Sequence, residues 1–191
     1  MYLWLKTTSR KTVMKSYGFY DGEINSKKDT AYYEAIGKVN KKYLPKKFQT
    51  KTYYKETDIV LRNLRNLELA DNFKLEEFRC NCNRKYCSGY PVVLDRQLLI
   101  NLQTLRNKYG PITVSGKLRC QKYNDSIPGS IKKSAHTKGK ALDIDLGSKS
   151  DTLAERKKIM AEFKKMPKSK YTYCDEGKNP NMGNSIHIEV K

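Results

Sequence analysis

The chain has 191 residues, and its 39 Lys or Arg against 20 Asp or Glu give a formal net charge of +19. This length fits one or two domains, and the charge favours a polyanionic partner such as nucleic acid or the anionic polymers of a bacterial wall. With 31% charged residues and no apolar run near the roughly 20 residues of a membrane-spanning helix, the sequence excludes membrane insertion. The apolar opening is also shorter than the core of a signal peptide, about 7–15 residues, so Sec export is not expected.

The first segment is rich in Lys and Tyr and contains neither Cys nor His. Asp21-Gly22 predicts a turn, because Gly accepts the positive φ that such turns require. A helix is predicted to follow, with Asp29-Thr30 as its N-cap. Its apolar face is formed by Ala31, Ala35, Ile36 and Val39. These features, from Tyr17 to Tyr43, resemble the small helical peptidoglycan-binding domain of bacterial wall hydrolases.

A change of composition marks the end of this module. Leu61, Leu64 and Leu67 recur at helical spacing and predict a closing helix, after which Asp71-Asn72 predicts a short linker. All Cys and His residues lie beyond Asn72. We therefore expect a helical module over residues 1–68 and a second domain over residues 69–191.

Four of the five cysteines form two groups in the second domain. Cys80, Cys82 and Cys87 lie close together, and Cys120 directly follows Arg119. A structural zinc held by all four would join the two segments. Disulfides would suit a protein that works outside the cell, and free thiols would suit the reducing cytosol. The spacing leaves these three interpretations open.

His187 lies within a segment of strict alternation, and His136 lies just before another. Asp143 and Asp145 alternate with aliphatic residues over 141–146, and His187 and Glu189 do so over 186–190. Period two predicts two half-buried strands that carry these polar side chains on one face. If the strands pair antiparallel, His187 comes close to Asp143, and His136 can fold back toward both. Two imidazoles and a carboxylate would hold zinc with one open position, as in catalytic sites; a hydrogen-bonded surface pair is the alternative.

The string Ser134-x-His136-x-x-Gly139-x-Ala141-x-Asp143, followed by a strand His near the C-terminus, resembles a family of murein peptidases. This is the family of zinc D-Ala-D-Ala carboxypeptidases and L-alanyl-D-glutamate endopeptidases. The resemblance runs from about Phe73 to the last residue, and it includes the Ser-Gly, Arg and Asn of segment 112–130. It implies an α+β domain in which helices flank a small antiparallel sheet that carries the zinc site.

The resemblance also implies roles for individual residues. It makes His136, Asp143 and His187 the zinc ligands. Arg119 would clamp a carbonyl or carboxylate of the substrate. The remaining substrate contacts would come from Ser134 and Asn124.

The general base is not fixed by the motif, because Asn184 stands where several branches of this family place an acid. Asp175 and Glu176, just before the last strand, are the catalytic candidates for this role. Asp145 and Glu189 are assigned to orienting the zinc ligands.

Together these features predict a zinc-dependent peptidoglycan peptidase similar to phage endolysins, either a D,D-carboxypeptidase or a murein endopeptidase. It would wait in the cytoplasm until it is released to the wall, where peptidoglycan and anionic polymers are its partners. A non-catalytic zinc-containing wall-binding protein is one alternative, motivated by Asn184. A basic nucleic-acid binder organised around the cysteines is the other, although no zinc-finger, RRM or basic-zipper pattern supports it.

Overall fold

The computed structural model describes residues 5–64, 68–87, 89–177 and 182–191. The chain forms two compact units, one of Met1–Leu69 with Phe73–Glu76 and the other of Ala70–Asn72 with Glu77–Lys191. Within the described ranges, no helix combines the length and the apolar character that a bilayer span requires.

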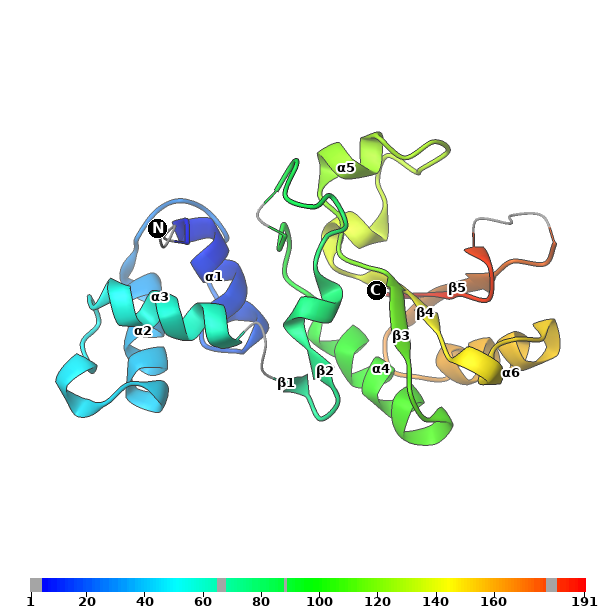
Figure 1. Ribbon diagram of the computed structural model, residues 1–191, viewed down its shortest axis with the longest axis horizontal. Coiled ribbons are helices and arrows are strands. Elements are labelled where there is room, and N and C mark those ends of the chain that lie inside the picture. Colours follow the sequence, from blue (N-terminus) through cyan, green and yellow to red (C-terminus); the bar gives the residue numbers. More distant parts are fainter. Residues whose placement is uncertain (1–4, 65–67, 88, 178–181) are drawn as a thin grey trace. The chain divides into compact units, whose positions relative to one another are not determined.

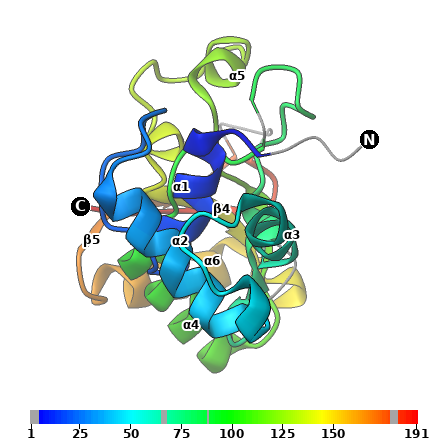
Figure 2. The ribbon, with the colours of Figure 1, turned by 90° about the vertical axis from the view of Figure 1, so that its left-hand side faces the viewer.

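Three helices that pack against one another build the N-terminal unit (Figure 2). They are α1 (Thr7–Ser16), α2 (Thr30–Tyr43) and α3 (Tyr54–Leu64), with a short 3-10 turn η1 (Lys46–Phe48) before α3. The predicted cap of α2 is confirmed, because the Asp29 side chain accepts a hydrogen bond from the backbone N–H of Tyr32 at 2.8 Å. The predicted closing helix ends at Leu64, and Leu67 lies outside the described residues.

A small hairpin follows this helix. Strands β1 (Glu68–Ala70) and β2 (Phe73–Lys74) form a two-stranded sheet, and Asp71 and Asn72 lie in the turn between them. These two residues are therefore a hairpin turn and not the predicted linker. Asp and Asn favour such turns because their short polar side chains bond to nearby backbone. A 3-10 turn, η2 (Leu75–Phe78), continues from β2.

The C-terminal unit contains a four-stranded antiparallel sheet in the order β3-β4-β6-β5. Its strands are β3 (Thr113–Gly116), β4 (Ala141–Asp145), β5 (Ser169–Cys174) and β6 (Ile186–Val190). Figure 1 shows α4 (Arg96–Tyr109) and α6 (Leu153–Lys164) on one side of this sheet and the segment around α5 (Gln121–Asp125) on the other. Two 3-10 turns, η3 (Ala135–Lys138) and η4 (Gly147–Lys149), flank β4. The predicted α+β class is confirmed.

The alternation read from the sequence explains how this sheet is oriented. Leu142, Ile144 and Ile188 are completely buried on the apolar face. Strands β4 and β6 pair antiparallel, as predicted, and the register places Asp143 directly opposite His187. Because successive side chains point to opposite faces, both residues lie on the face that α4 and α6 leave uncovered.

Candidate metal centre

Three side chains converge on the polar face of the sheet. His136, Asp143 and His187 each offer one ligand atom, and these atoms lie within 4.8 Å of one another. Oδ1 of Asp143 is 3.4 Å from Nε2 of His136 and 2.8 Å from Nδ1 of His187. Both histidines are buried, with 4% and 7% of their surface exposed. The structure thus brings together the three residues that the sequence motif singled out.

His136 is held by a hydrogen bond through the nitrogen that points away from this centre, and Glu189 lies near the corresponding nitrogen of His187. Nδ1 of His136 lies 3.0 Å from the carbonyl oxygen of Lys117, to which it donates, so that Nε2 keeps its lone pair. Nε2 of His187 lies 3.9 Å from Oε2 of Glu189, and the other carboxylate oxygen of Glu189 accepts a hydrogen bond from Lys170 at 2.5 Å. A carbonyl or carboxylate behind the ring is typical of metal-binding histidines. The donor set therefore fits zinc.

The charge of Asp143 suits the same role. Burial raises the pKa of this carboxyl group, but hydrogen bonds and charge interactions with His136 and His187 outweigh burial and hold the pKa well below its usual range. The group is therefore ionised at neutral pH, which metal binding requires.

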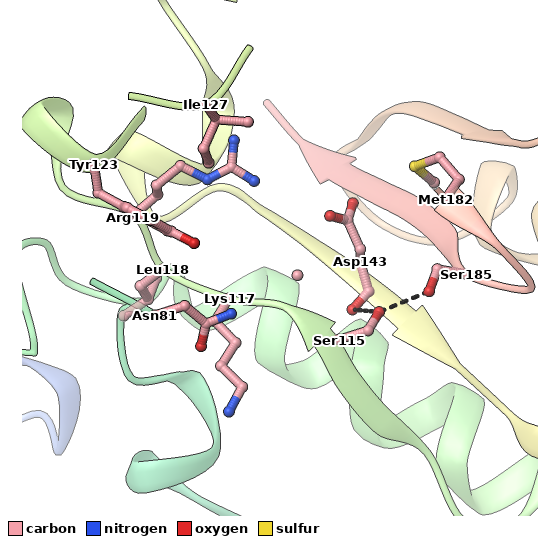
Figure 3. Close-up of a pocket in the computed structure, with 11 residues that line it drawn as sticks. Asn81, Ser115, Lys117, Leu118, Arg119, Tyr123, Ile127, Asp143, Met182 and Ser185 are labelled. Carbon is pink, nitrogen blue, oxygen red and sulfur yellow. Dashed lines mark hydrogen bonds between the residues drawn. The ribbon is translucent and has the colours of Figure 1, made fainter. Parts of the chain in front are cut away.

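A close backbone approach fixes the position of Asp143. A Cβ at Gly116 of β3 would lie only 1.8 Å from Oδ2 of Asp143, so only glycine fits at this point of the strand. The neighbouring Ser115 donates to the carbonyl oxygen of Asp143 and shares a 2.8 Å hydrogen bond with Ser185 (Figure 3). Gly116 of the Ser-Gly pair noted in the sequence thus leaves room for the Asp143 side chain, while Ser115 ties the strand to the backbone of β4.

Arg119 faces Asp143 across a pocket of about 210 Å³ (Figure 3). Its Nη1 donates to Oδ1 of Asn124 at 3.2 Å, and Nδ2 of Asn124 donates to the carbonyl oxygen of Ile131. Asn124 is completely buried. In this structure the buried side chain of Asn124 holds Arg119 and the loop at Ile131, and its contact with substrate stays a prediction.

A larger cleft of about 1240 Å³ opens over the three converging side chains and includes Ser134 in its wall. Tyr171 and Tyr173 line it as well, and the Tyr173 ring stacks on His187 with centroids 4.8 Å apart. Sequence reasoning missed both tyrosines. The alternation over residues 169–174 could have identified them, because it predicts a strand. That strand, β5, pairs with β6 in a register that places Tyr173 beside His187.

The other predicted acids lie elsewhere. Asp145 accepts hydrogen bonds from the Gly147 N–H and the Ser150 hydroxyl, and so holds the turn after β4. Glu176 forms a 3.2 Å ion pair with Lys157 of α6. Asp145, Asp175 and Glu176 are not among the described residues that line the cleft. Their positions lend no support to the predicted roles in orienting ligands or accepting a proton.

Asn184 has a structural role of its own. Its Nδ2 donates to Asp151 at 3.0 Å, and its Oδ1 accepts from Nη1 of Arg156 at 3.2 Å. The buried Arg156 also donates to the backbone oxygen of Asp175. Asn184 therefore holds the segment before β6 against the start of α6.

A second group of potential ligands consists of cysteines. The sulfur atoms of Cys80, Cys82, Cys87 and Cys120 lie within 4.8 Å of one another. Burial raises the pKa of the Cys80 thiol. It also raises that of Cys82, but hydrogen bonds from backbone N–H groups and from neighbouring thiols outweigh it and lower the pKa of Cys82 to about 6. The structure thus contains two groups of side chains suited to bind a metal.

We expect Gly139→Ala to destabilise the turn that carries His136. Gly139 has φ 72°, and an added Cβ would lie 1.9 Å from the backbone oxygen of Val93. The left-handed conformation alone costs about 1–2 kcal/mol, and the steric overlap adds to this cost. Gly129→Ala is a matched control, since Gly129 has φ 73° but no atom within 4 Å of the added Cβ. Denaturant unfolding should show the larger loss for Gly139→Ala, and equal losses would contradict the expected overlap.

A family model described as Peptidase M15 matches residues 71–189. The matched range contains both groups of potential metal ligands and Arg119, whereas α1, α2 and α3 lie outside it. No curated protein matches the chain.

Proposed function

Because the chain belongs to the peptidase M15 family, we propose that it is a zinc-dependent hydrolase of the peptide stem or cross-link of peptidoglycan. The observation that carries this proposal is the convergence of His136 Nε2, Asp143 Oδ1 and His187 Nδ1 beside an open cleft. Three protein ligands of this kind leave zinc one free position, which is the arrangement of catalytic and not structural sites.

The metal and the residues around the cleft have different proposed roles in the reaction. When bound, zinc polarises the scissile carbonyl and lowers the pKa of a coordinated water toward about 7. Nδ1 of His136 donates to the Lys117 carbonyl oxygen, which leaves its Nε2 available as a ligand. Nδ1 of His187 lies 2.8 Å from Oδ1 of Asp143 and would give up that hydrogen bond when it binds the ion. Asp143 contributes the negative charge that balances the cation.

Arg119 is proposed to bind the substrate. A guanidinium has five N–H donors, so the bond from Nη1 to Asn124 leaves donors for a carbonyl or carboxylate in the pocket. Peptidoglycan stems offer such groups, and the planar fork of Arg suits a carboxylate. Asn124 keeps the fork in place because its own amide is tied to Ile131.

The proposal is tested by mass spectrometry of purified muropeptides incubated with the zinc-loaded protein. The chelated protein and the His187→Ala variant serve as controls. A fragment that forms only with the loaded native protein supports the peptidase and identifies the bond by its mass, which separates carboxypeptidase from endopeptidase. Zinc bound at the His centre without any fragment would instead favour a non-catalytic wall-binding protein.

Glu189→Gln is expected to lower zinc affinity at the His centre by about 10- to 100-fold, the usual cost of losing a partner behind a metal-binding histidine. The carboxylate of Glu189 is only 14% exposed and lies between His187 and Lys170. Competition with a chelator of known affinity measures the change. Glu176→Gln is the control, because its ion pair with Lys157 is 55% exposed at both side chains. Equal affinities of the two variants would contradict the role of Glu189.

We further propose that the Lys-rich N-terminal unit docks the enzyme on the wall, and that the protein acts like an endolysin released from the cytoplasm. The net charge of +19 supports long-range attraction to anionic wall polymers. The fragment 69–191 should cleave soluble muropeptides like the full chain but should act more slowly on intact sacculi at low salt. Equal rates on sacculi would remove the docking role.

A further inference from the structure

Four cysteine side chains from two distant segments meet beside the pocket of Arg119. Cys80, Cys82 and Cys87 lie in the loop between η2 and α4, and Cys120 is the N-cap of α5. Zinc bound to four sulfurs at about 2.3 Å would set them about 3.8 Å apart. The observed sulfurs lie within 4.8 Å of one another, and those of Cys82 and Cys87 are 3.4 Å apart. Small shifts would let all four bind one ion.

Backbone N–H groups surround these sulfurs. The Gly89 N–H donates to the Cys87 sulfur at 3.4 Å. Further N–H donors to the sulfurs of Cys80 and Cys82 come from the backbone of Cys82, Tyr86, Cys87 and Cys120. Such donors favour a thiolate, which is the form that binds metal, but burial still leaves the pKa of Cys80 and Cys87 raised. A pair of disulfides would carry no charge for these N–H groups to stabilise.

The loop backbone is itself shaped around the sulfurs. Asn83 and Arg84 adopt left-handed conformations, with φ 51° and 67°. Hydrogen bonds from Cys80 N–H to the Gly89 oxygen and from Lys85 N–H to the Cys82 oxygen close the loop. The left-handed conformation is unfavourable for Arg84, whereas asparagine adopts it more readily, so a cross-link would help to hold this loop in place.

We propose that Cys80, Cys82, Cys87 and Cys120 bind a second, structural zinc ion that fixes the wall of the substrate pocket. Four protein ligands close a tetrahedral site and leave no open position for chemistry. The effect on substrate binding rests on the function proposed above, whereas the metal site itself does not.

Three contacts link this site to the pocket. Arg119 directly precedes Cys120, and its backbone N–H donates to the His136 oxygen at 3.2 Å. Asn81, between two of the cysteines, lines the same pocket as Arg119 and Asp143 (Figure 3). Tyr123 of α5 lines that pocket too and packs against the cysteine cluster. A metal that joins the two segments would therefore set the distance between opposite parts of the pocket wall.

Metal analysis of the full chain tests the site. The native protein should contain two zinc ions, and His187→Ala and Cys82→Ser should each contain one. Cys174→Ser is the matched control and should keep both ions, since Cys174 is buried in β5 outside the cluster. A native protein with one zinc, and with a mass lower by two hydrogens for each disulfide, would overturn the proposal. One zinc together with five thiols that react freely would overturn it as well.

Cobalt substitution gives a readout that does not depend on activity. Four thiolates should produce intense sulfur-to-cobalt charge-transfer absorption, which should persist in His187→Ala and disappear in Cys82→Ser. Because Cys82→Ser could unfold the loop, Cys87→His provides a second test. Histidine is a common fourth ligand beside three cysteines, so this variant should retain two metal ions with weaker charge-transfer absorption. If His187→Ala lost the absorption, the absorption would not come from the four cysteines alone, and the assignment would be overturned.

The link to the pocket is tested by a double-mutant cycle. Cys120→Ser should lower kcat/KM on muropeptides by about 10- to 100-fold, and its effect should shrink in an Arg119→Ala background because the two residues act together. Independent effects would overturn the positioning role. If no muropeptide is cleaved while the cobalt spectrum shows four thiolates, the proposed function fails and the second metal site stands.

Discussion

His136→Ala is expected to abolish amide hydrolysis while the fold persists. His136 supplies one of three converging ligand atoms, and two remaining ligands hold zinc poorly. A catalytic metal contributes several kcal/mol of transition-state stabilisation, and each 1.4 kcal/mol is about tenfold in rate. We therefore expect kcat/KM on muropeptides to fall by at least about 1000-fold. Rates and zinc content are measured on the same preparations.

The fold should tolerate this change because the strands bearing the other two ligands have a separate apolar face. Leu142, Ile144 and Ile188 are completely buried on that face, away from the imidazole. Lys132→Ala, an exposed change in the same loop, controls for loop damage. A lost unfolding transition in His136→Ala would show that the metal at this centre is structural. Retained activity would refute the zinc-peptidase proposal.

The alternation of residues in two short segments predicted that Asp143 and His187 lie close together, and the resemblance of the motif added His136 and zinc. Period two placed Asp143 and His187 on the same face, and antiparallel pairing then put them opposite each other. These features depend on local periodicity, which a single sequence records directly.

The roles of isolated polar residues were harder to predict because they depend on burial and on the paths of loops. Asn124 lies in a motif rich in polar residues, but only the fold shows that it is completely buried behind Arg119. Asp175 and Glu176 are near His187 in sequence, yet Glu176 pairs with α6. Tyr173 was missed although strand register places it beside His187. Closeness in sequence is a weaker guide than register.

The cysteines illustrate the same limit at longer range. Their spacing left zinc, disulfides and free thiols open, because sequence alone does not show where the loop after η2 lies relative to α5. The fold brings Cys120 within 4.8 Å of the three cysteines of that loop. It also shows backbone N–H groups that donate to the sulfurs. The convergence of the four sulfurs favours a shared metal ion, and it cannot be read from spacing.

Gly116→Ala is expected to disrupt the metal centre through one added methyl group. Its Cβ would lie 1.8 Å from Oδ2, 2.4 Å from Cγ and 2.5 Å from Cβ of Asp143. Rotation of the carboxylate relieves only the first of these overlaps. Strand β4 cannot shift easily, because it lies between β3 and β6 and its Leu142 and Ile144 are completely buried. Either β3 separates locally or Asp143 turns away from both histidines.

Both responses displace the carboxylate from the two imidazoles, so zinc affinity at this centre should fall by at least about 100-fold, the upper end of the loss seen when ligand orientation is disturbed. Ser115→Ala is the matched control on the same strand, because it removes the hydrogen bonds to Asp143 and Ser185 without adding volume. Its zinc affinity should change far less. If Gly116→Ala binds zinc as tightly as the native protein, β3 yields without moving Asp143, and the close approach of the two strands does not hold the ligand in place.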